Sequence, residues 1–257
     1  MKLADTVVVV TGGGSGIGAA MARRFAEESP ATLILADIDL EAAAIVADEV
    51  GGVAVQVDVS DAEANRALIE GTEERFGPID LFCANAGIGV VGDEQSDPAL
   101  WDRMWAINVM SHVHAARYLI PSWKARGSGY FLATVSAAGL LTNLKAAQYS
   151  VTKHGALAFA EWLAVTYGDA GIRVSALCPQ FVNTPLLADS EAFQALGGNH
   201  TLEPEEVAEA VVAGLEQENF LILPHPEVAQ YFANKANDYD RWLGGMRKLQ
   251  RTVFPDA

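Results

Sequence analysis

The stretch Val7-Val8-Val9-Val10-Thr11-Gly12-Gly13-Gly14-Ser15-Gly16-Ile17-Gly18 decides the fold of this chain. Four consecutive valines are typical of a strand buried on both faces of a parallel sheet. Glycines after the strand permit a tight turn and let backbone amides approach a pyrophosphate at the N-terminus of the next helix. The alternative is that these glycines form only a flexible loop. The position of the turn, directly between a strand and a helix, disfavours that alternative. The predicted cofactor contacts of the turn are Gly12, Ser15, Gly16, Ile17 and Gly18.

An acidic residue ends the second predicted strand. Asp37 follows Gly18 by 19 residues, where a carboxylate can accept hydrogen bonds from an adenosine ribose diol and would repel a 2′-phosphate. The next residue, Ile38, offers no cation to bind such a phosphate. The pair predicts NAD rather than NADP as cofactor. The alternative role of Asp37 is to cap the following helix.

Short apolar segments alternate with longer amphipathic ones along the whole chain, which is typical of an α/β fold with a parallel sheet covered by helices on both faces. The predicted strands are Thr6–Thr11, Thr32–Ala36, Val53–Val57, Leu81–Ala84, Tyr130–Val135, Val174–Cys178 and Phe220–Leu223. The predicted helices are Ile17–Glu28, Leu40–Glu49, Asp61–Phe76, Pro98–Lys124, Ala146–Tyr167 and Glu205–Leu215.

The composition predicts one acidic globular domain over residues 1–257. The chain has 17 Lys and Arg against 33 Asp and Glu, a net charge of −16, and 51% hydrophobic residues. Such a surface repels nucleic acid and anionic membranes, so we expect a small-molecule substrate. Two segments break the alternation: an irregular loop at about 180–201, and a C-terminal extension at about 225–257 whose apolar spacing suggests an amphipathic helix. The extension is expected to pack on the core, contact another subunit or form a pocket wall.

Cysteine and histidine usage predicts neither disulfides nor a metal site. Cys83 and Cys178 lie in separate apolar segments, as buried reduced thiols do. His112 and His114 are two residues apart on a predicted helix and so do not face each other. The N-terminal stretch resembles no secretory signal, and no run of about 18 apolar residues predicts a membrane span. We therefore expect a cytoplasmic protein.

A second set of motifs identifies a family. Tyr149-Ser150-Val151-Thr152-Lys153 is a Tyr-x-x-x-Lys pattern on a predicted helix, Ser136 lies 13 residues before its tyrosine, and Asn85-Ala86-Gly87 follows the fourth strand. Together with Asn108 and the glycine-rich turn, this set resembles the short-chain dehydrogenase/reductase family in its subtype of about 250 residues. The resemblance extends over about residues 3–184. It implies a Rossmann-type sheet of about seven parallel strands in the order 3-2-1-4-5-6-7.

The resemblance also implies roles for individual residues. The catalytic set of the family falls on Ser136, Tyr149, Lys153 and Asn108, with Lys153 holding the nicotinamide ribose and Asn108 holding a water that links Lys153 to solvent. Contacts to the rest of an NAD molecule are implied for residues along the strand ends. These are Asp58 and Val59 at the adenine, Asn85, Ala86 and Gly87 along the cofactor, and Pro179, Val182 and Thr184 at the nicotinamide end.

The chemistry of these side chains supports the assignment independently. Tyr149 and Lys153 are four residues apart and share one helix face. A free phenol titrates near pH ~10, and a neighbouring ammonium together with a positive nicotinamide favours the phenolate. Tyr149 could then take the proton from an alcohol as hydride leaves its carbon, while Ser136 donates to the reacting oxygen.

The predicted substrate pocket is mostly apolar and contains no Arg or Lys. Its residues are Ile88, Ala138, Leu141, Gln180, Phe181, Leu186 and Leu187. Because a carboxylate is normally met by a cation, we expect a neutral, hydrophobic secondary alcohol or ketone. Gln180 stands where the family usually has glycine, which leaves the shape of the substrate open.

Two alternatives remain. A hydroxy acid with a lipid-like tail would make the protein similar to the NAD-dependent prostaglandin dehydrogenases. A non-catalytic NAD-binding sensor is the other alternative, but a sensor has no need of the full catalytic set. The family commonly forms dimers and tetramers through the two long helices, so we expect a homodimer or homotetramer.

Overall fold

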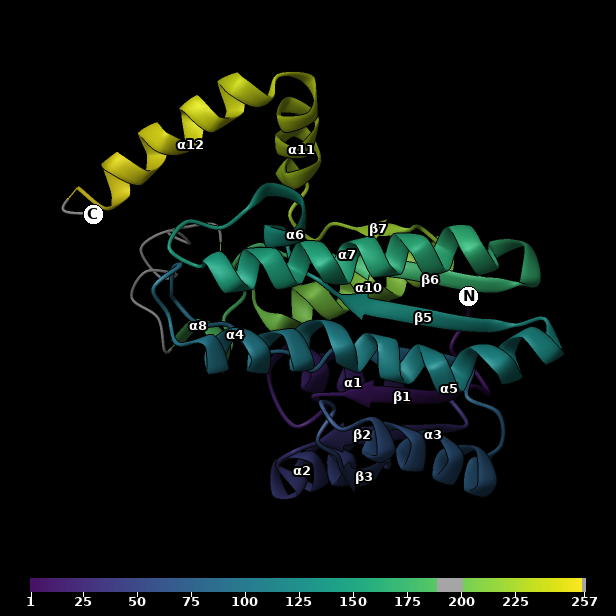
Figure 1. The fold of residues 1–257 in the computed structure, drawn as a ribbon. Helices are drawn as coiled ribbons and strands as arrows, with labels where there is room; N and C mark the ends of the chain where they lie inside the picture. The colour runs from purple at the N-terminus through teal and green to yellow at the C-terminus, as the bar shows by residue number, and fades with distance from the viewer. Residues whose placement is uncertain (189–200, 256–257) are drawn as a thin grey trace.

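A seven-stranded parallel sheet forms the centre of the computed structural model, which describes residues 1–188 and 201–255 (Figure 1). The strands lie in the order β3-β2-β1-β4-β5-β6-β7, which confirms the predicted fold class and topology. They are β1 (Val7–Thr11), β2 (Thr32–Asp37), β3 (Val53–Gln56), β4 (Leu81–Ala84), β5 (Gly129–Thr134), β6 (Ile172–Leu177) and β7 (Leu221–Ile222).

The valines of β1 show why the sheet is covered on both faces. Val7 and Val9 belong to the hydrophobic cluster on one side of the sheet. Val8 and Val10 belong to the cluster on the other side. Successive side chains of a strand point to opposite faces, so a continuous apolar strand requires two apolar layers of helices.

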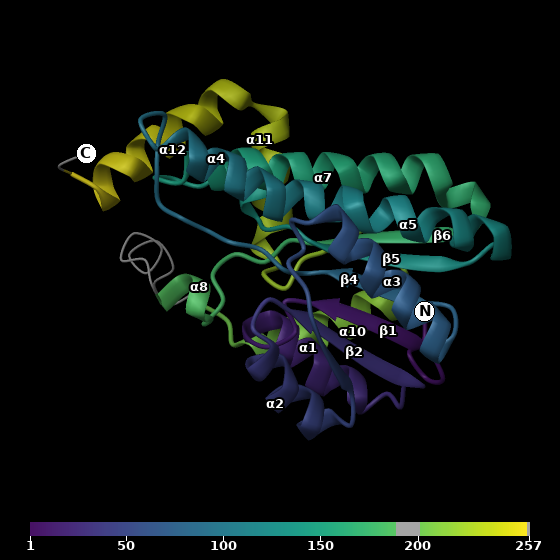
Figure 2. The ribbon, with the colours of Figure 1, turned by 60° about the horizontal axis from the view of Figure 1, so that its bottom comes forward.

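The helices divide between the two faces (Figures 1 and 2). One face is covered by α1 (Gly16–Ala26), α2 (Leu40–Val50) and α10 (Pro204–Gln217). The other is covered by α3 (Ala62–Phe76), α5 (Ser111–Arg126) and α7 (Ala147–Tyr167). Among the described helices, none is long and apolar enough to cross a lipid bilayer.

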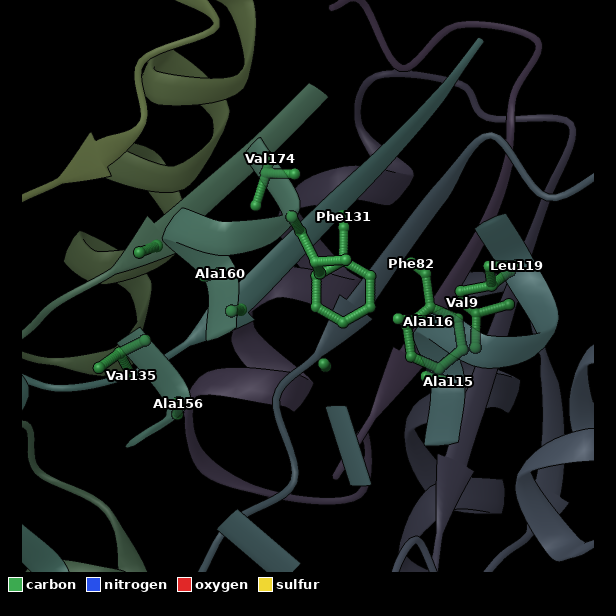
Figure 3. Packing of buried hydrophobic residues seen from close by; sticks show 14 of the residues in the cluster. Val9, Phe82, Ala115, Ala116, Leu119, Phe131, Val135, Ala156, Ala160 and Val174 are labelled. Atoms are coloured by element: carbon green, nitrogen blue, oxygen red, sulfur yellow. The ribbon is translucent and has the colours of Figure 1, made fainter. Parts of the chain in front are cut away.

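Aromatic rings and small residues fill the core on the α5 and α7 side (Figure 3). The rings of Phe82 and Phe131 stack with their centroids 6.0 Å apart. Ala115 and Ala116 of α5 lie beside Phe82, and their small side chains let this helix approach the sheet closely. The close fit fixes the position of α5 on the sheet.

The helix expected at Pro98–Lys124 has an irregular centre. It consists of α4 (Pro98–Trp105), a π-helical turn η1 (Ala106–Met110) and α5. A π-turn inserts one residue into the helical repeat, so residues before and after it face different directions. The residue pattern gave no sign of this turn.

Two further details differ from the expectation. The extension forms two helices, α11 (Glu227–Asn237) and α12 (Tyr239–Val253), instead of one, because Asp238 leaves the helical conformation and caps α12 by accepting from the Arg241 N–H. Two short helices, α6 (Ala138–Leu141) and α8 (Pro185–Ala188), were not expected. The predicted loop at about 180–201 lies outside the described residues over 189–200.

Candidate active site

The glycine-rich turn forms a cradle at the end of β1. Gly12 and Gly16 have φ of +65° and +50°, a conformation that favours glycine. A Cβ on Gly18 would overlap the carbonyl oxygen of Gly12, so the turn packs closely against the first turn of α1. Ser15 is the N-cap of α1, but its side chain makes no capping hydrogen bond. The backbone N–H groups of this helix end can therefore receive an anion such as a pyrophosphate.

Thr11 and Asn85 hold the neighbouring strand ends together. The Thr11 hydroxyl donates to the Cys83 carbonyl (3.1 Å) and accepts from the backbone N–H of Asn85 (2.9 Å). The Asn85 amide donates to the Thr11 carbonyl (3.0 Å) and accepts from the Thr134 hydroxyl (3.0 Å). These bonds fix the ends of β1, β4 and β5 as one wall.

Asp37 reaches back to the same turn. Its carboxylate accepts from the backbone N–H of Gly14 (2.9 Å) and from that of Asp39 (3.0 Å). Helix α2 is capped by Asp39, whose side chain accepts from the Ala42 N–H. The alternative role of Asp37 as the helix cap is therefore wrong.

Ser136, Tyr149 and Lys153 meet beyond the end of β5. The Ser136 hydroxyl accepts from the Ala138 N–H (3.1 Å), and its side chain is hydrogen-bonded to that of Tyr149. The Lys153 ammonium donates to the Thr134 carbonyl (3.0 Å) and lies 5.6 Å from the centre of the Tyr149 ring. All three side chains line one cavity of about 790 Å³.

Asn108 lies in the π-turn and does not line this cavity. It is fully buried, and its side chain braces the loop after β4 by accepting from the Ile88 N–H (2.9 Å) and donating to the Ile88 carbonyl (2.9 Å). It also donates to the Thr152 hydroxyl (3.1 Å). The side chain of Asn108 therefore positions Ile88, which belongs to the cavity wall.

The same cavity contains nearly every predicted cofactor and substrate contact. The predicted cofactor residues on its surface are Gly12, Ser15, Gly16, Ile17, Asp37, Ile38, Asp58, Val59, Asn85, Ala86, Gly87, Tyr149, Lys153, Pro179, Val182 and Thr184. Gly18 is absent from this set because it packs against Gly12. The predicted substrate residues on the surface are Ile88, Ala138, Leu141, Gln180, Phe181 and Leu186. The side chain of Leu187 lies outside the described part of the structure.

The C-terminal helices add a wall that the sequence alone did not place. Residues that line the cavity from these helices are Glu227, Tyr231, Trp242, Met246 and Leu249. Helix α11 is held in place by Lys235, whose ammonium donates to the Leu140 carbonyl (2.7 Å), and by Glu227, which accepts from the Gln180 amide (2.8 Å). The apolar spacing of the extension indicated an amphipathic helix, but it did not indicate that the apolar face lines this cavity.

One further lining residue corrects the expectation of a pocket without cations. Arg103 of α4 lines the cavity and makes no ion pair within residues 1–188 and 201–255. No pattern in the sequence signalled Arg103, because Ile107, a lining residue in the turn that follows α4, was not a predicted contact either.

Burial shifts the pKa values of both Tyr149 and Lys153. It raises the pKa of Tyr149, an effect that the hydrogen bond with Ser136 opposes. It also lowers the pKa of Lys153 to about 8. The phenolate expected from the sequence is therefore not favoured by the protein alone and requires a positive charge brought by a ligand.

The thiols and the other ligating side chains offer no further chemistry at this site. Cys83 and Cys178 are both buried and unpaired, and burial raises the pKa of Cys178 to about 12. In the part of the chain that the structure describes, His, Cys, Asp and Glu side chains form no group of three that could hold a metal ion.

The buried Lys153 makes stability depend on pH. Its pKa is 10.5 when exposed and about 8 in the fold, so between these values the unfolded chain binds one more proton and the free energy of unfolding rises with pH. Lys153→Met removes this dependence. We expect the melting temperature of Lys153→Met, relative to wild type, to fall from pH 7 to pH 9.5, by the equivalent of about 2 kcal/mol. Lys248→Met, on exposed α12, is the control, and a relative melting temperature of Lys153→Met that is constant with pH would contradict the assignment.

Comparison with known proteins agrees with the geometry. The family model described as short chain dehydrogenase matches residues 6–195. The chain is 32% identical to a 1-deoxy-11-beta-hydroxypentalenate dehydrogenase of Streptomyces exfoliatus over 88% of this chain and 86% of that protein. It is also 32% identical to a cyclohexanol dehydrogenase of an Acinetobacter strain, over 82% of this chain and 87% of that protein.

A solved structure shares both the fold and the type of ligand expected here. It is a short chain dehydrogenase/reductase from Burkholderia phymatum in complex with NAD, with a TM-score of 0.85 and 27% identity over 93% of this chain and 96% of that one. The fold, the identity and the matched residues agree in assigning the chain to one family. The chain therefore belongs to the short-chain dehydrogenase/reductase family of oxidoreductases.

Proposed function

We propose that this protein is an NAD-dependent dehydrogenase that interconverts a secondary alcohol and a ketone by hydride transfer. The observation that carries the proposal is that Ser136, Tyr149 and Lys153 share one cavity with the glycine cradle and Asp37. A cofactor bound along the strand ends would then lie next to the acid/base group. The relatives named above are dehydrogenases of alcohols, which supports the same reaction class.

In this proposal, three side chains have separate roles in alcohol oxidation. Ser136 donates a hydrogen bond to the substrate oxygen and orients it. Tyr149 takes the hydroxyl proton as the carbon–hydrogen bond breaks. Lys153 holds a positive charge near the phenol and favours its ionised form. The hydride of the carbinol carbon passes to the nicotinamide, which is the chemistry that the cofactor supplies.

Asp37 supports NAD as the cofactor. Its carboxylate lies at the cavity surface with its oxygens held by the N–H groups of Gly14 and Asp39. A fixed carboxylate there accepts hydrogen bonds from ribose hydroxyls and repels a 2′-phosphate. Ile38 beside it is 64% exposed and brings no positive charge.

The cavity walls support a hydrophobic substrate. Apolar residues of the cavity wall include ones from α6, from the segment after β6 and from the C-terminal helices. Trp242, Met246 and Leu249 present the apolar side of α12 to the cavity. We therefore favour a neutral, bulky alcohol whose apolar part extends toward α12.

A hydroxy acid is the second candidate substrate. Arg103 lines the cavity without an ion pair among the described residues, and a guanidinium is the natural partner of a carboxylate. The hydroxypentalenate named for one relative is such a carboxylate. The lipid-like hydroxy acid considered from the sequence belongs to the same class.

Tyr149→Phe tests the proposed reaction. Turnover, followed by NADH absorbance with a panel of alcohols, should fall by far more than tenfold, while NADH affinity stays within about twofold, because the phenol acts in the transition state. Tyr130→Phe, which changes a buried phenol bonded to Ser175 away from the cavity, is the matched control. A loss of less than tenfold, ~1.4 kcal/mol, contradicts the role, and a wild type that binds NADH but turns over no alcohol or ketone supports the sensor.

Asp37→Ala combined with Ile38→Arg tests the cofactor. The preference for NADH over NADPH in a binding titration should fall by at least about tenfold, because a repulsive charge is replaced by an attractive one. Asp39→Ala is the control. It removes the cap of α2 at a cost of ~1 kcal/mol of stability and should leave the preference unchanged. Equal affinity of the wild type for both cofactors would overturn the assignment.

Arg103→Gln separates the two substrate candidates. If the substrate is a hydroxy acid, the KM for it should rise about tenfold or more, as expected for the loss of a charged hydrogen bond worth ~1.5–3 kcal/mol. The KM for a neutral alcohol such as cyclohexanol should not change. Arg117→Gln, on the exposed side of α5, serves as the control. Unchanged KM values for both substrates would exclude Arg103 as a carboxylate site.

We further propose a cytoplasmic homodimer or homotetramer that uses α7 as part of its interface. Trp162 and Val165 lie on this helix and are 53% and 86% exposed, and exposed apolar residues that lie together mark contact surfaces. Light scattering at micromolar concentration should give the mass of two or four chains, and Val165→Asp should lower it. A wild-type monomer would reject the proposal.

A further inference from the structure

Two polar side chains, Gln180 and Glu227, lie side by side on the wall of the cavity. Gln180 follows β6 and Glu227 begins α11, and both line the cavity. The Gln180 amide nitrogen donates to a Glu227 carboxylate oxygen (2.8 Å). Phe181 and Leu186, which line the same cavity, are apolar. No step of the proposed reaction uses the polar pair, although it is placed where a substrate would bind.

The side chain of Gln180 has a fixed orientation. An ionised carboxylate only accepts hydrogen bonds, so the amide must turn its NH2 group toward Glu227. The carbonyl oxygen of the amide then lies on the side away from the carboxylate. The backbone N–H of Gln180 donates to Nδ1 of His225 (3.2 Å), a side chain that is 3% exposed. Gln180 is thus held both at its backbone and at its amide.

The carbonyl oxygen of the Gln180 amide is the acceptor that this arrangement offers to a ligand. No donor within residues 1–188 and 201–255 bonds to it. A polar atom that loses water without gaining a partner is unfavourable, so a site built around such an atom discriminates against ligands that do not pair it. The pocket therefore favours a substrate that carries a hydrogen-bond donor besides its reacting hydroxyl.

This acceptor lies close to the place of the reacting oxygen. The Ser136 hydroxyl is 3.4 Å from the Pro179 carbonyl oxygen, and the Ala137 N–H donates to the same carbonyl (2.8 Å). Gln180 directly follows Pro179 in the chain. Since Ser136 orients the substrate oxygen in the proposed reaction, a donor that meets Gln180 sits on a carbon near the carbinol and not at the far end of a long substrate.

The charges around the cavity favour a neutral donor. Arg103 and Lys153 line the same cavity, so a substrate ammonium would meet two like charges there, although Glu227 would attract it. A hydroxyl group can donate to the Gln180 carbonyl without this repulsion. A second hydroxyl is therefore the group that this part of the pocket fits best.

We propose that Gln180 is a specificity-determining residue that accepts a hydrogen bond from a second hydroxyl group of the substrate, and that Glu227 is the positioning residue that orients its amide. The inference rests on the proposed dehydrogenase function. It narrows the substrate class to diols whose second hydroxyl stands near the carbinol carbon. The apolar remainder of such a diol packs against the apolar residues that α12 presents to the cavity.

A set of substrates built on one ring tests the proposal in the wild type. The set comprises cyclohexanol, 2-methylcyclohexanol, 2-aminocyclohexanol, and the cis and trans isomers of cyclohexane-1,2-diol and cyclohexane-1,3-diol. These compounds share the carbinol and differ in the group near it. At least one diol isomer should exceed both mono-alcohols in kcat/KM by about tenfold or more, mainly through a lower KM. The amino alcohol should stay below that diol.

Variants separate the roles of the two residues, and the readout is the ratio of kcat/KM for the preferred diol to kcat/KM for cyclohexanol. Gln180→Leu removes the acceptor at similar volume and should lower this ratio about tenfold. Glu227→Leu lets the amide rotate and should lower the ratio about threefold or more. Glu227→Gln keeps an acceptor oxygen for the amide and should restore the ratio to within about twofold. Gln230→Leu, on the exposed side of α11, is the matched control and should keep the wild-type ratio.

Several outcomes would overturn the proposal. One is a wild type that oxidises cyclohexanol but prefers no diol isomer, and another is a preference for the amino alcohol, since the subsite then takes a cation. A folded Gln180→Leu or Glu227→Leu that keeps the wild-type ratio is a third. The wild-type comparison needs no variant, so it decides even where a variant does not fold. Absence of turnover with every alcohol and ketone would instead contradict the proposed function, so the two failures are distinct.

Discussion

The hydrogen bonds of Thr11 join the ends of β1 and β4, and the candidate site depends on this join. One hydroxyl donates to the Cys83 carbonyl and accepts from the N–H groups of Asn85 and Ala86. It therefore fixes the glycine cradle on one strand against the Asn85 loop on the next. Parallel strands present their carboxyl ends at one edge of a sheet. The glycine cradle, Asp37 and Ser136 lie at or just after strand ends on that edge, so a shift of one strand end would separate them.

Tyr149 and Lys153 are both buried, and this burial is energetically unfavourable for their charged forms. Lys153 is 3% exposed and Tyr149 is 9% exposed, and burial disfavours the charged form of both. The same core holds α7 rigidly. This helix packs on β5 and β6 through small residues such as Ala156 and Ala160 (Figure 3). Rigid placement keeps the ammonium close to the phenol, while a bound cofactor is needed before the phenolate becomes favourable.

The cavity wall formed by α12 differs from the glycine cradle in the kind of group that it presents. The cradle is made of backbone groups at strand ends, whereas α12 presents side chains from a helix with no fully buried residue. Figures 1 and 2 show α12 extending from the body of the molecule, connected to it through α11. The contacts that hold α11 end on α6 and on Gln180, which flank Ser136 and the end of β6. The C-terminal part of the cavity wall is thus fixed to the segments that flank Ser136 and the end of β6.

Local sequence patterns determined the sheet, most of its helices and the residues of the glycine turn, because period-two and period-3.6 hydrophobicity and glycine chemistry act over a few residues. They also brought Tyr149 and Lys153 onto one helix face. Only the tertiary structure decided the π-turn at Asn108, the position of Arg103 at the cavity, and the break at Asp238 that turns α12 toward the site. The π-turn, for example, holds Asn108, whose side chain binds the Ile88 backbone 20 residues away. A pattern read along the sequence cannot contain such contacts, because they exist only once the strands have brought their ends together.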